Sequence, residues 1–225
     1  MKIISPSFEI LTPIDADYIL HHIERCTRTA YKSEDKIGPG SAERLIASTL
    51  KRGHESVVEH ISLSVRIICD RGVTHEIVRH RMASYTQEST RYCNYGSGKF
   101  GEEITVIKPP FWPECDVRYA AWANACAKAE DAYIDLLRSG ATPQEARAVL
   151  PNSLKTEIVM TANIREWRHF FRLRCDPAAH PQIREIARPL LAEMQSRIPI
   201  LFDDIYSEVF GNGITVDESE EQKNA

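Results

Sequence analysis

Two segments in which apolar and polar residues alternate set the strongest limit on the fold of this chain. In the first, Ile61, Leu63, Val65 and Ile67 occupy every second position, and residues 156–162 repeat the alternation. A period of two is that of a strand with one buried face. The apolar face of such a sheet has to be covered by helices, so we predict an α+β fold.

The rest of the chain supplies the covering helices and a few more strands. We predict helices at 15–26, 41–50, 71–80, 117–137, 163–174, 181–198 and 200–210, and strands at 2–11 and 104–107. Thr142-Pro-Gln-Glu145 has the spacing of a capping box, which predicts a further helix that Pro151 ends. Loops are expected at 32–40 and after Arg81.

These elements predict one compact domain with a mixed or antiparallel sheet flanked by helices, because no internal repeat or linker interrupts the chain. The domain covers residues 1–214. Residues 215–225 are acidic and lack apolar anchors, so we expect a disordered tail there.

Composition excludes several classes of protein. With 43% hydrophobic residues the 225-residue chain can bury a core, and its net charge of −4 disfavours a general nucleic-acid binder. Apolar runs are too short for a membrane span and no signal-peptide layout is present, so we expect a cytoplasmic protein. The six cysteines form no CxxC pair, which indicates reduced thiols in place of disulfides or a zinc ribbon.

A metal site and a nucleophilic cysteine are two alternatives that the sequence disfavours. His75-Glu-Ile-Val-Arg-His80 resembles the zinc-protease pattern, but its histidines are five positions apart, which places them roughly 140° apart around a helix. We therefore predict no metal. Cys93 lies near several cations that would lower its pKa, yet no histidine is placed in sequence as its partner, so a structural cysteine is favoured.

The stretch RHRMASYTQESTRY, from Arg79 to Tyr92, points to an anionic ligand in spite of the negative net charge. Its arginines can grip a phosphate with two parallel hydrogen bonds, and its hydroxyls supply neutral donors. Neither GxGxxG nor GxxxxGK[ST] occurs in the chain, so a nucleotide would be held by side chains and not by a glycine-rich loop.

This stretch resembles the signature of the flavin-dependent thymidylate synthases. It fits RHRxxSxxxxSxR at every fixed position, from Arg79 to Arg91. The segment GHESVVEH at 53–60 resembles a second element of that family. Asn163-Ile-Arg165, His169 and Arg174-x5-His180 resemble its C-terminal binding segment, so the resemblance covers about residues 15–210.

The resemblance implies a homotetramer whose active sites are shared between subunits. It also implies methylation of dUMP to dTMP, with 5,10-methylenetetrahydrofolate as carbon donor, FAD reduced by NADPH as hydride source, and no protein nucleophile. Implied cofactor contacts are His54, Ser56, Glu59, Arg79, His80, Arg81, Gln87, Asn163, Arg165 and His169. Implied dUMP contacts are Glu76, Arg79, Gln87, Glu88, Ser89, Thr90, Arg91, Arg147 and Arg174. Arg174 is the implied catalytic residue, which promotes ionisation at uracil N3.

Two other functions fit part of the same pattern. A non-catalytic nucleotide-binding protein would keep the phosphate-binding loop without turnover, but it would not need Arg174, Arg147 and His54 together. RNA binding is disfavoured because the chain is acidic and has no RNP-type aromatic motif.

Overall fold

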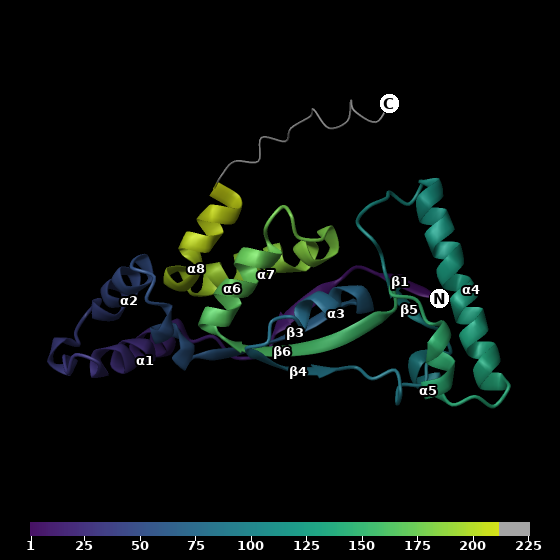
Figure 1. Ribbon diagram of the computed structural model, residues 1–225, viewed down its shortest axis with the longest axis horizontal. Coiled ribbons are helices and arrows are strands. Elements are labelled where there is room, and N and C mark those ends of the chain that lie inside the picture. Colours follow the sequence, from purple (N-terminus) through teal and green to yellow (C-terminus); the bar gives the residue numbers. More distant parts are fainter. Residues whose placement is uncertain (212–225) are drawn as a thin grey trace, which may run out of the picture.

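Strands β3 (Ser62–Asp70) and β6 (Lys155–Asn163) form the centre of a four-stranded sheet in the computed structural model, which describes residues 1–211 (Figure 1). They pair antiparallel along their whole length, from Ser62 opposite Asn163 to Asp70 opposite Lys155. Strand β2 (Ser7–Ile10) flanks β3, and β4 (Ala83–Gln87) flanks β6, both also antiparallel. The sheet order is β2-β3-β6-β4, which confirms the predicted α+β class with an antiparallel sheet.

The alternation in the sequence matches the two faces of this sheet. Leu63, Val65 and Ile67 of β3 are buried together with Ile158 and Met160 of β6. Four helices lie over this face, namely α3 (Arg71–Ile77), α6 (Ile164–Arg174), α7 (Pro181–Arg197) and α8 (Pro199–Tyr206) (Figure 1). Two others, α1 (Ala16–Thr29) and α2 (Ser41–Lys51), lie at one end of the sheet. The opposite face carries polar side chains, and the hydroxyls of Ser64 and Thr161 share a hydrogen bond of 2.7 Å there.

The helices begin close to the positions that their capping residues predict. Asp15 caps α1 and accepts a hydrogen bond from the Tyr18 amide, and Asn163 caps α6 in the same way through the Glu166 amide. The bounds are α1 Ala16–Thr29, α2 Ser41–Lys51, α3 Arg71–Ile77, α4 Val117–Arg138, α5 Pro143–Ala146, α6 Ile164–Arg174, α7 Pro181–Arg197 and α8 Pro199–Tyr206. Shorter helical turns are η1 Glu34–Lys36, η2 Glu55–His60, η3 Gly98–Phe100, η4 Arg147–Val149 and η5 Ser207–Gly211.

Two predicted elements differ from the structure in ways that have a physical cause. The strand expected at 2–11 is two strands, because Pro6 cannot donate to a ladder and the chain changes sheets there. β1 (Lys2–Ile4) pairs parallel with β5 (Thr105–Ile107), whereas β2 joins the main sheet. The predicted loop after Arg81 is in fact β4, which β6 holds through non-local hydrogen bonds.

The other differences concern helix ends. The helix expected at 71–80 ends at Ile77, three residues before His80. The capping box at Thr142 is confirmed, but α5 is a single turn that continues as the 3₁₀ turn η4. The last helix ends at Tyr206 and is followed by the π-helical turn η5, and the predicted loop at 32–40 contains η1. The tail predicted at 215–225 lies outside the described residues.

A second, smaller core lies at the end of the sheet opposite α1 and α2 (Figure 1). In this core, Cys126 and Tyr133 of α4 pack with Val106 of β5 and with Ala146, the last residue of α5. In residues 1–211, no helix is long and apolar enough to cross a membrane.

Candidate functional site

Arg174, the last residue of α6, forms hydrogen bonds with Glu76 of α3 and with His80, which lies between α3 and β4. Its Nη1 donates to the Glu76 carboxylate at 3.0 Å, and its Nη2 donates to the Glu76 carbonyl at 3.0 Å. Its Nε donates to His80 Nε2 at 3.1 Å. Three residues implied by the resemblance therefore meet at one point, although Arg174 lies more than 90 positions after the other two.

His80 is buried between α6 and β4, and its hydrogen bonds define its protonation. An arginine N–H can only donate, so His80 Nε2 accepts from Arg174. The imidazole proton then lies on Nδ1, which donates to Glu166 at 3.0 Å. Burial lowers the pKa of His80, and the nearby Arg174 lowers it further, while the hydrogen bond to Glu166 opposes this. The imidazole is accordingly neutral.

A tyrosine and an acid that sequence reasoning missed hold this histidine. Tyr85 of β4 places its hydroxyl 2.6 Å from the His80 carbonyl and 2.9 Å from that of Ile77, and burial raises the pKa of Tyr85 to about 12. Glu166 follows the Asn163 cap by three positions, which suggested only a helix start. Its partner lies 86 positions away along the chain, so no local pattern indicated the contact.

The residues after β4 form a second group around the implied phosphate-binding loop. Arg147 comes close to Thr90, with 3.4 Å between Nη1 and Oγ1. Arg91 is exposed, and its backbone amide donates to the Ser89 hydroxyl at 3.2 Å. The loop thus brings the Arg147 guanidinium to the Thr90 hydroxyl, while the Arg91 guanidinium lies over the Tyr92 ring, 5.5 Å from its centre. A guanidinium and a hydroxyl side by side are donors that suit a phosphate monoester.

Gln87, the last residue of β4, and Glu88, which follows it, form hydrogen bonds with other side chains of this chain. The Glu88 carboxylate accepts from the Tyr95 hydroxyl at 2.7 Å and from Lys155 Nζ at 2.8 Å. Gln87 lies between α3 and β6, with its amide nitrogen 3.3 Å from the hydroxyls of both Thr74 and Thr156. The structure therefore gives both residues contacts that hold the loop against the sheet.

A third group lines a hollow of about 400 Å³ at the start of α6. Glu59 of η2 pairs with Arg165 at 2.5 Å across its rim. The His169 ring lies 5.5 Å from that of His80, centre to centre, which connects this hollow to the first group. The other lining residues are Glu55, Met82, Asn163, Glu166 and Arg172.

His54 and Ser56 are separated from this third group. They line a different hollow of about 280 Å³ between α1, α2 and η2, together with Arg28, Tyr31 and Arg52 among others. Residues of η2 therefore face two hollows. Within residues 1–211 of one chain, the residues that the resemblance implies therefore do not all line the same cavity.

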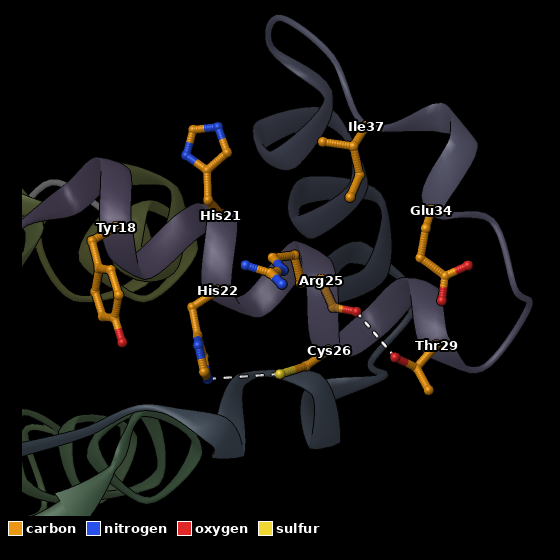
Figure 2. Close-up of a pocket in the computed structure, with 8 residues that line it drawn as sticks. All are labelled: Tyr18, His21, His22, Arg25, Cys26, Thr29, Glu34 and Ile37. Carbon is orange, nitrogen blue, oxygen red and sulfur yellow. Dashed lines mark hydrogen bonds between the residues drawn. The ribbon is translucent and has the colours of Figure 1, made fainter.

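A further hollow, of about 720 Å³, is lined by none of the residues that the resemblance implies. It lies along the exposed side of α1 and is bounded by Glu34 and Ile37 (Figure 2). His22 and Cys26 point the same way, with 3.6 Å between Nε2 and Sγ, whereas His21 points away from them.

One cluster within residues 1–211 has the composition of a metal site. Ligand atoms of His80, Glu166 and His169 lie within 4.8 Å of one another. Both ring nitrogens of His80 are already engaged by Arg174 and Glu166, so the cluster is explained by hydrogen bonds. His75 is exposed while His80 is buried, so these two histidines do not face a common point.

A buried arginine that sequence reasoning also missed connects η2 with α6 and α8. The Arg168 side chain is 0% exposed and pairs with Glu55 of η2 at 3.1 Å and with Asp204 of α8 at 2.5 Å. It also donates to the Leu201 carbonyl. These contacts hold the turn that carries Ser56 and Glu59.

Comparisons with known proteins agree on one family. The model of the family described as "Thymidylate synthase complementing protein" matches residues 16–200. The flavin-dependent thymidylate synthase of Pyrococcus furiosus is 36% identical over 167 residues, which span 74% of this chain and 68% of that protein. The Mycobacterium tuberculosis enzyme of the same name is 33% identical over 219 residues, with 90% and 86% covered.

A solved structure supports the same relationship. The UMP/dUMP methylase PolB from Streptomyces cacaoi, bound with 5-Br dUMP, superposes with a TM-score of 0.74 at 26% identity. The match covers 94% of this chain and 98% of that chain.

Proposed function

Because the chain belongs to the flavin-dependent thymidylate synthase family, we propose that it methylates dUMP to dTMP. The carbon comes from 5,10-methylenetetrahydrofolate, and FAD reduced by NADPH supplies the hydride when it is bound. The observation that carries the proposal is the docking of Arg174 on Glu76 and His80 beside the signature stretch. A guanidinium fixed in this way can polarise a uracil imide, which supports the proposal.

The residues of this chain then have separate tasks. Arg174 stabilises negative charge at uracil N3, since a guanidinium beside an imide favours its anion. The phosphate of dUMP is held by Ser89, Thr90, Arg91 and Arg147. Glu76 and Arg79 contact the nucleotide from the end of α3. Gln87 and Glu88 shape the loop through the contacts described above.

The residues around η2 and the start of α6 have the chemistry that FAD requires. Arg165 and His169 line the 400 Å³ hollow with Asn163 and Glu59. Arg81 directly precedes Met82 of the same lining, and both Arg79 and Arg81 are exposed. Cations suit the diphosphate of FAD, and Asn163, Glu59 and His169 offer hydrogen bonds to its polar edges. We assign His54 and Ser56, in the neighbouring hollow, to the same cofactor.

Cysteine chemistry near the proposed uracil position is disfavoured. Cys175 follows Arg174 directly, but it is buried, and burial raises the pKa of its thiol to about 12. A thiol with such a pKa stays protonated at neutral pH and is a poor nucleophile. This supports a reaction in which the protein binds and polarises the substrate without forming a covalent bond to it.

We propose a homotetramer with shared sites, and the separation of the groups within one chain supports sites that are shared between subunits. The phosphate-binding loop and the two hollows beside η2 lie in different parts of one chain, while Arg79 and Arg81 are exposed near Met82, whose exposed fraction is 73%. A second copy facing these side chains can complete each site. Light scattering should give four chains per particle. A cytoplasmic location fits an enzyme whose substrates are dissolved nucleotides.

Flavin binding and dTMP formation distinguish the proposed enzyme from a nucleotide-binding protein without activity. We expect the purified protein to be yellow after incubation with FAD, to bleach with NADPH, and to form dTMP from dUMP and methylenetetrahydrofolate. Binding of dUMP without flavin uptake or dTMP formation would instead support the non-catalytic alternative.

Substitution of Arg91 tests the phosphate-binding loop. We expect Arg91→Ala to raise the KM for dUMP by about 10- to 100-fold, because a charge-assisted hydrogen bond contributes roughly 1.5–3 kcal/mol. The measurement is steady-state dTMP formation at varied dUMP. Arg138→Ala, which removes an exposed arginine of α4, is the matched control and should leave KM unchanged. An unchanged KM in Arg91→Ala would remove Arg91 from the substrate site.

A further inference from the structure

Glu166, His80 and Arg174 form a continuous chain of hydrogen bonds from the first turn of α6 to its last residue. Glu166 Oε1 is 3.0 Å from His80 Nδ1, and Arg174 Nε is 3.1 Å from His80 Nε2. Glu166 and His80 are both buried. Neither the sequence pattern nor the resemblance gave Glu166 a role.

The direction of each bond in this chain is fixed. Arg174 has only donors, so His80 must present a bare Nε2 to it. A neutral histidine with a bare Nε2 carries its proton on Nδ1, and that proton needs an acceptor in a buried position. Glu166 is that acceptor. Without it, a histidine with its proton on Nε2 would set an N–H against the N–H of Arg174.

The groups around His80 hold this arrangement from several elements. Helix α6 contributes Glu166, Arg174 and His169, and the Phe170 ring lies 5.0 Å from the imidazole, centre to centre. From β4, the Tyr85 hydroxyl contacts the His80 carbonyl. From α3, Glu76 faces His80 through the guanidinium that both residues contact.

We propose that Glu166 is a positioning residue, which fixes the tautomer of His80 and thereby aims Arg174 at the substrate. The aim of Arg174 at uracil rests on the proposed function, but the tautomer does not. The histidine acts as a neutral acceptor that orients the guanidinium, and Glu166 is held in place because its own amide is bonded to Asn163 at 2.9 Å. Orienting partners of this kind are known to affect function by 10- to 100-fold when removed from a metal-bound histidine.

Two variants of Glu166 test whether His80 needs a hydrogen-bond acceptor or a negative charge at this position. Glu166→Gln keeps an oxygen that accepts from Nδ1, so kcat should stay within about threefold of wild type. Glu166→Leu has no acceptor, and kcat should fall by about 10- to 100-fold with a smaller change in the KM for dUMP. Glu193→Gln, an exposed carboxylate of α7 that pairs with Arg197, is the matched control and should behave as wild type.

The decisive measurement is the tautomer of His80 by ¹⁵N NMR of histidine-labelled protein, which requires neither FAD nor turnover. In the wild type and in Glu166→Gln we expect a protonated Nδ1 and a bare Nε2. In Glu166→Leu the Nε2–H form should appear. His80 should also protonate at lower pH in Glu166→Gln than in the wild type, because the carboxylate that raises its pKa is gone.

A wild-type His80 with its proton on Nε2 would overturn the proposal, whether or not Glu166→Leu folds. Retention of both the tautomer and kcat in a folded Glu166→Leu would overturn it as well. If the tautomers behave as expected but the wild type forms no dTMP, the proposed function fails while the positioning of Arg174 by Glu166 stands.

Discussion

We expect the Arg174→Ala variant to form dTMP about 10²- to 10³-fold more slowly than the wild type, with kcat affected more than the KM for dUMP. We expect a large loss because the guanidinium is the group that we propose to stabilise charge at uracil N3, and it is already held by three hydrogen bonds. A group that is fixed before the reaction needs no reorganisation when charge develops. Steady-state kinetics at saturating FAD, NADPH and methylenetetrahydrofolate measure the effect.

Two further variants sharpen this prediction. Arg174→Lys keeps a positive charge but has no planar fork to bond Glu76 and His80 together, so its rate should lie between those of the wild type and Arg174→Ala. Arg197→Ala removes a surface arginine of α7 and should change nothing. If a folded Arg174→Ala that retains FAD turns over at the wild-type rate, another group polarises the uracil.

The parts of the fold that could be predicted from the sequence are those with local causes. The alternation of Leu63, Val65 and Ile67 gave β3, and the helix starts predicted at 15 and 163 coincide with the caps Asp15 of α1 and Asn163 of α6. Each depends on residues within a few positions of one another. By contrast, β4 is a strand because β6 lies next to it, and β6 is some 70 positions away in the sequence.

The same distinction applies to the candidate site. The signature stretch revealed its own residues because their spacing is fixed along the chain. Glu166 and Arg168 were missed because their partners lie 86 and 113 positions away, so only the folded chain brings them together. The sequence therefore indicated candidate ligand-binding groups, whereas the groups that hold these in place could be identified only from the structure.

Of the two residues that the sequence did not reveal, Arg168 is the one whose substitution we expect to lower stability most. Arg168→Met should lower the free energy of unfolding by about 3 kcal/mol, near the lower end for breaking a buried ion pair, because the Asp204 side chain is 45% exposed. The variant leaves the carboxylates of Glu55 and Asp204 close together without the buried cation. Urea unfolding followed by circular dichroism measures the change.

Arg172→Met is the matched control for this variant. Arg172 contacts the same two carboxylates, at 3.0 Å and 3.5 Å, but its side chain is 36% exposed. Water screens such a pair, so the expected loss is below about 1 kcal/mol. Equal and small losses in both variants would show that burial of Arg168 adds no stability.

The pH dependence gives a second test of the same network. Burial raises the pKa of Asp204, but the hydrogen bond and charge of Arg168 outweigh this and hold the pKa below its ordinary value of 3.8. A lowered pKa contributes stability above the unfolded-state value that is lost as the pH falls through the folded-state value. The difference between wild type and Arg168→Met should therefore be full at neutral pH and shrink below about pH 4 as the carboxylates protonate. A difference that stays constant down to pH 3 would mean that Arg168 stabilises the fold by packing and not by charge.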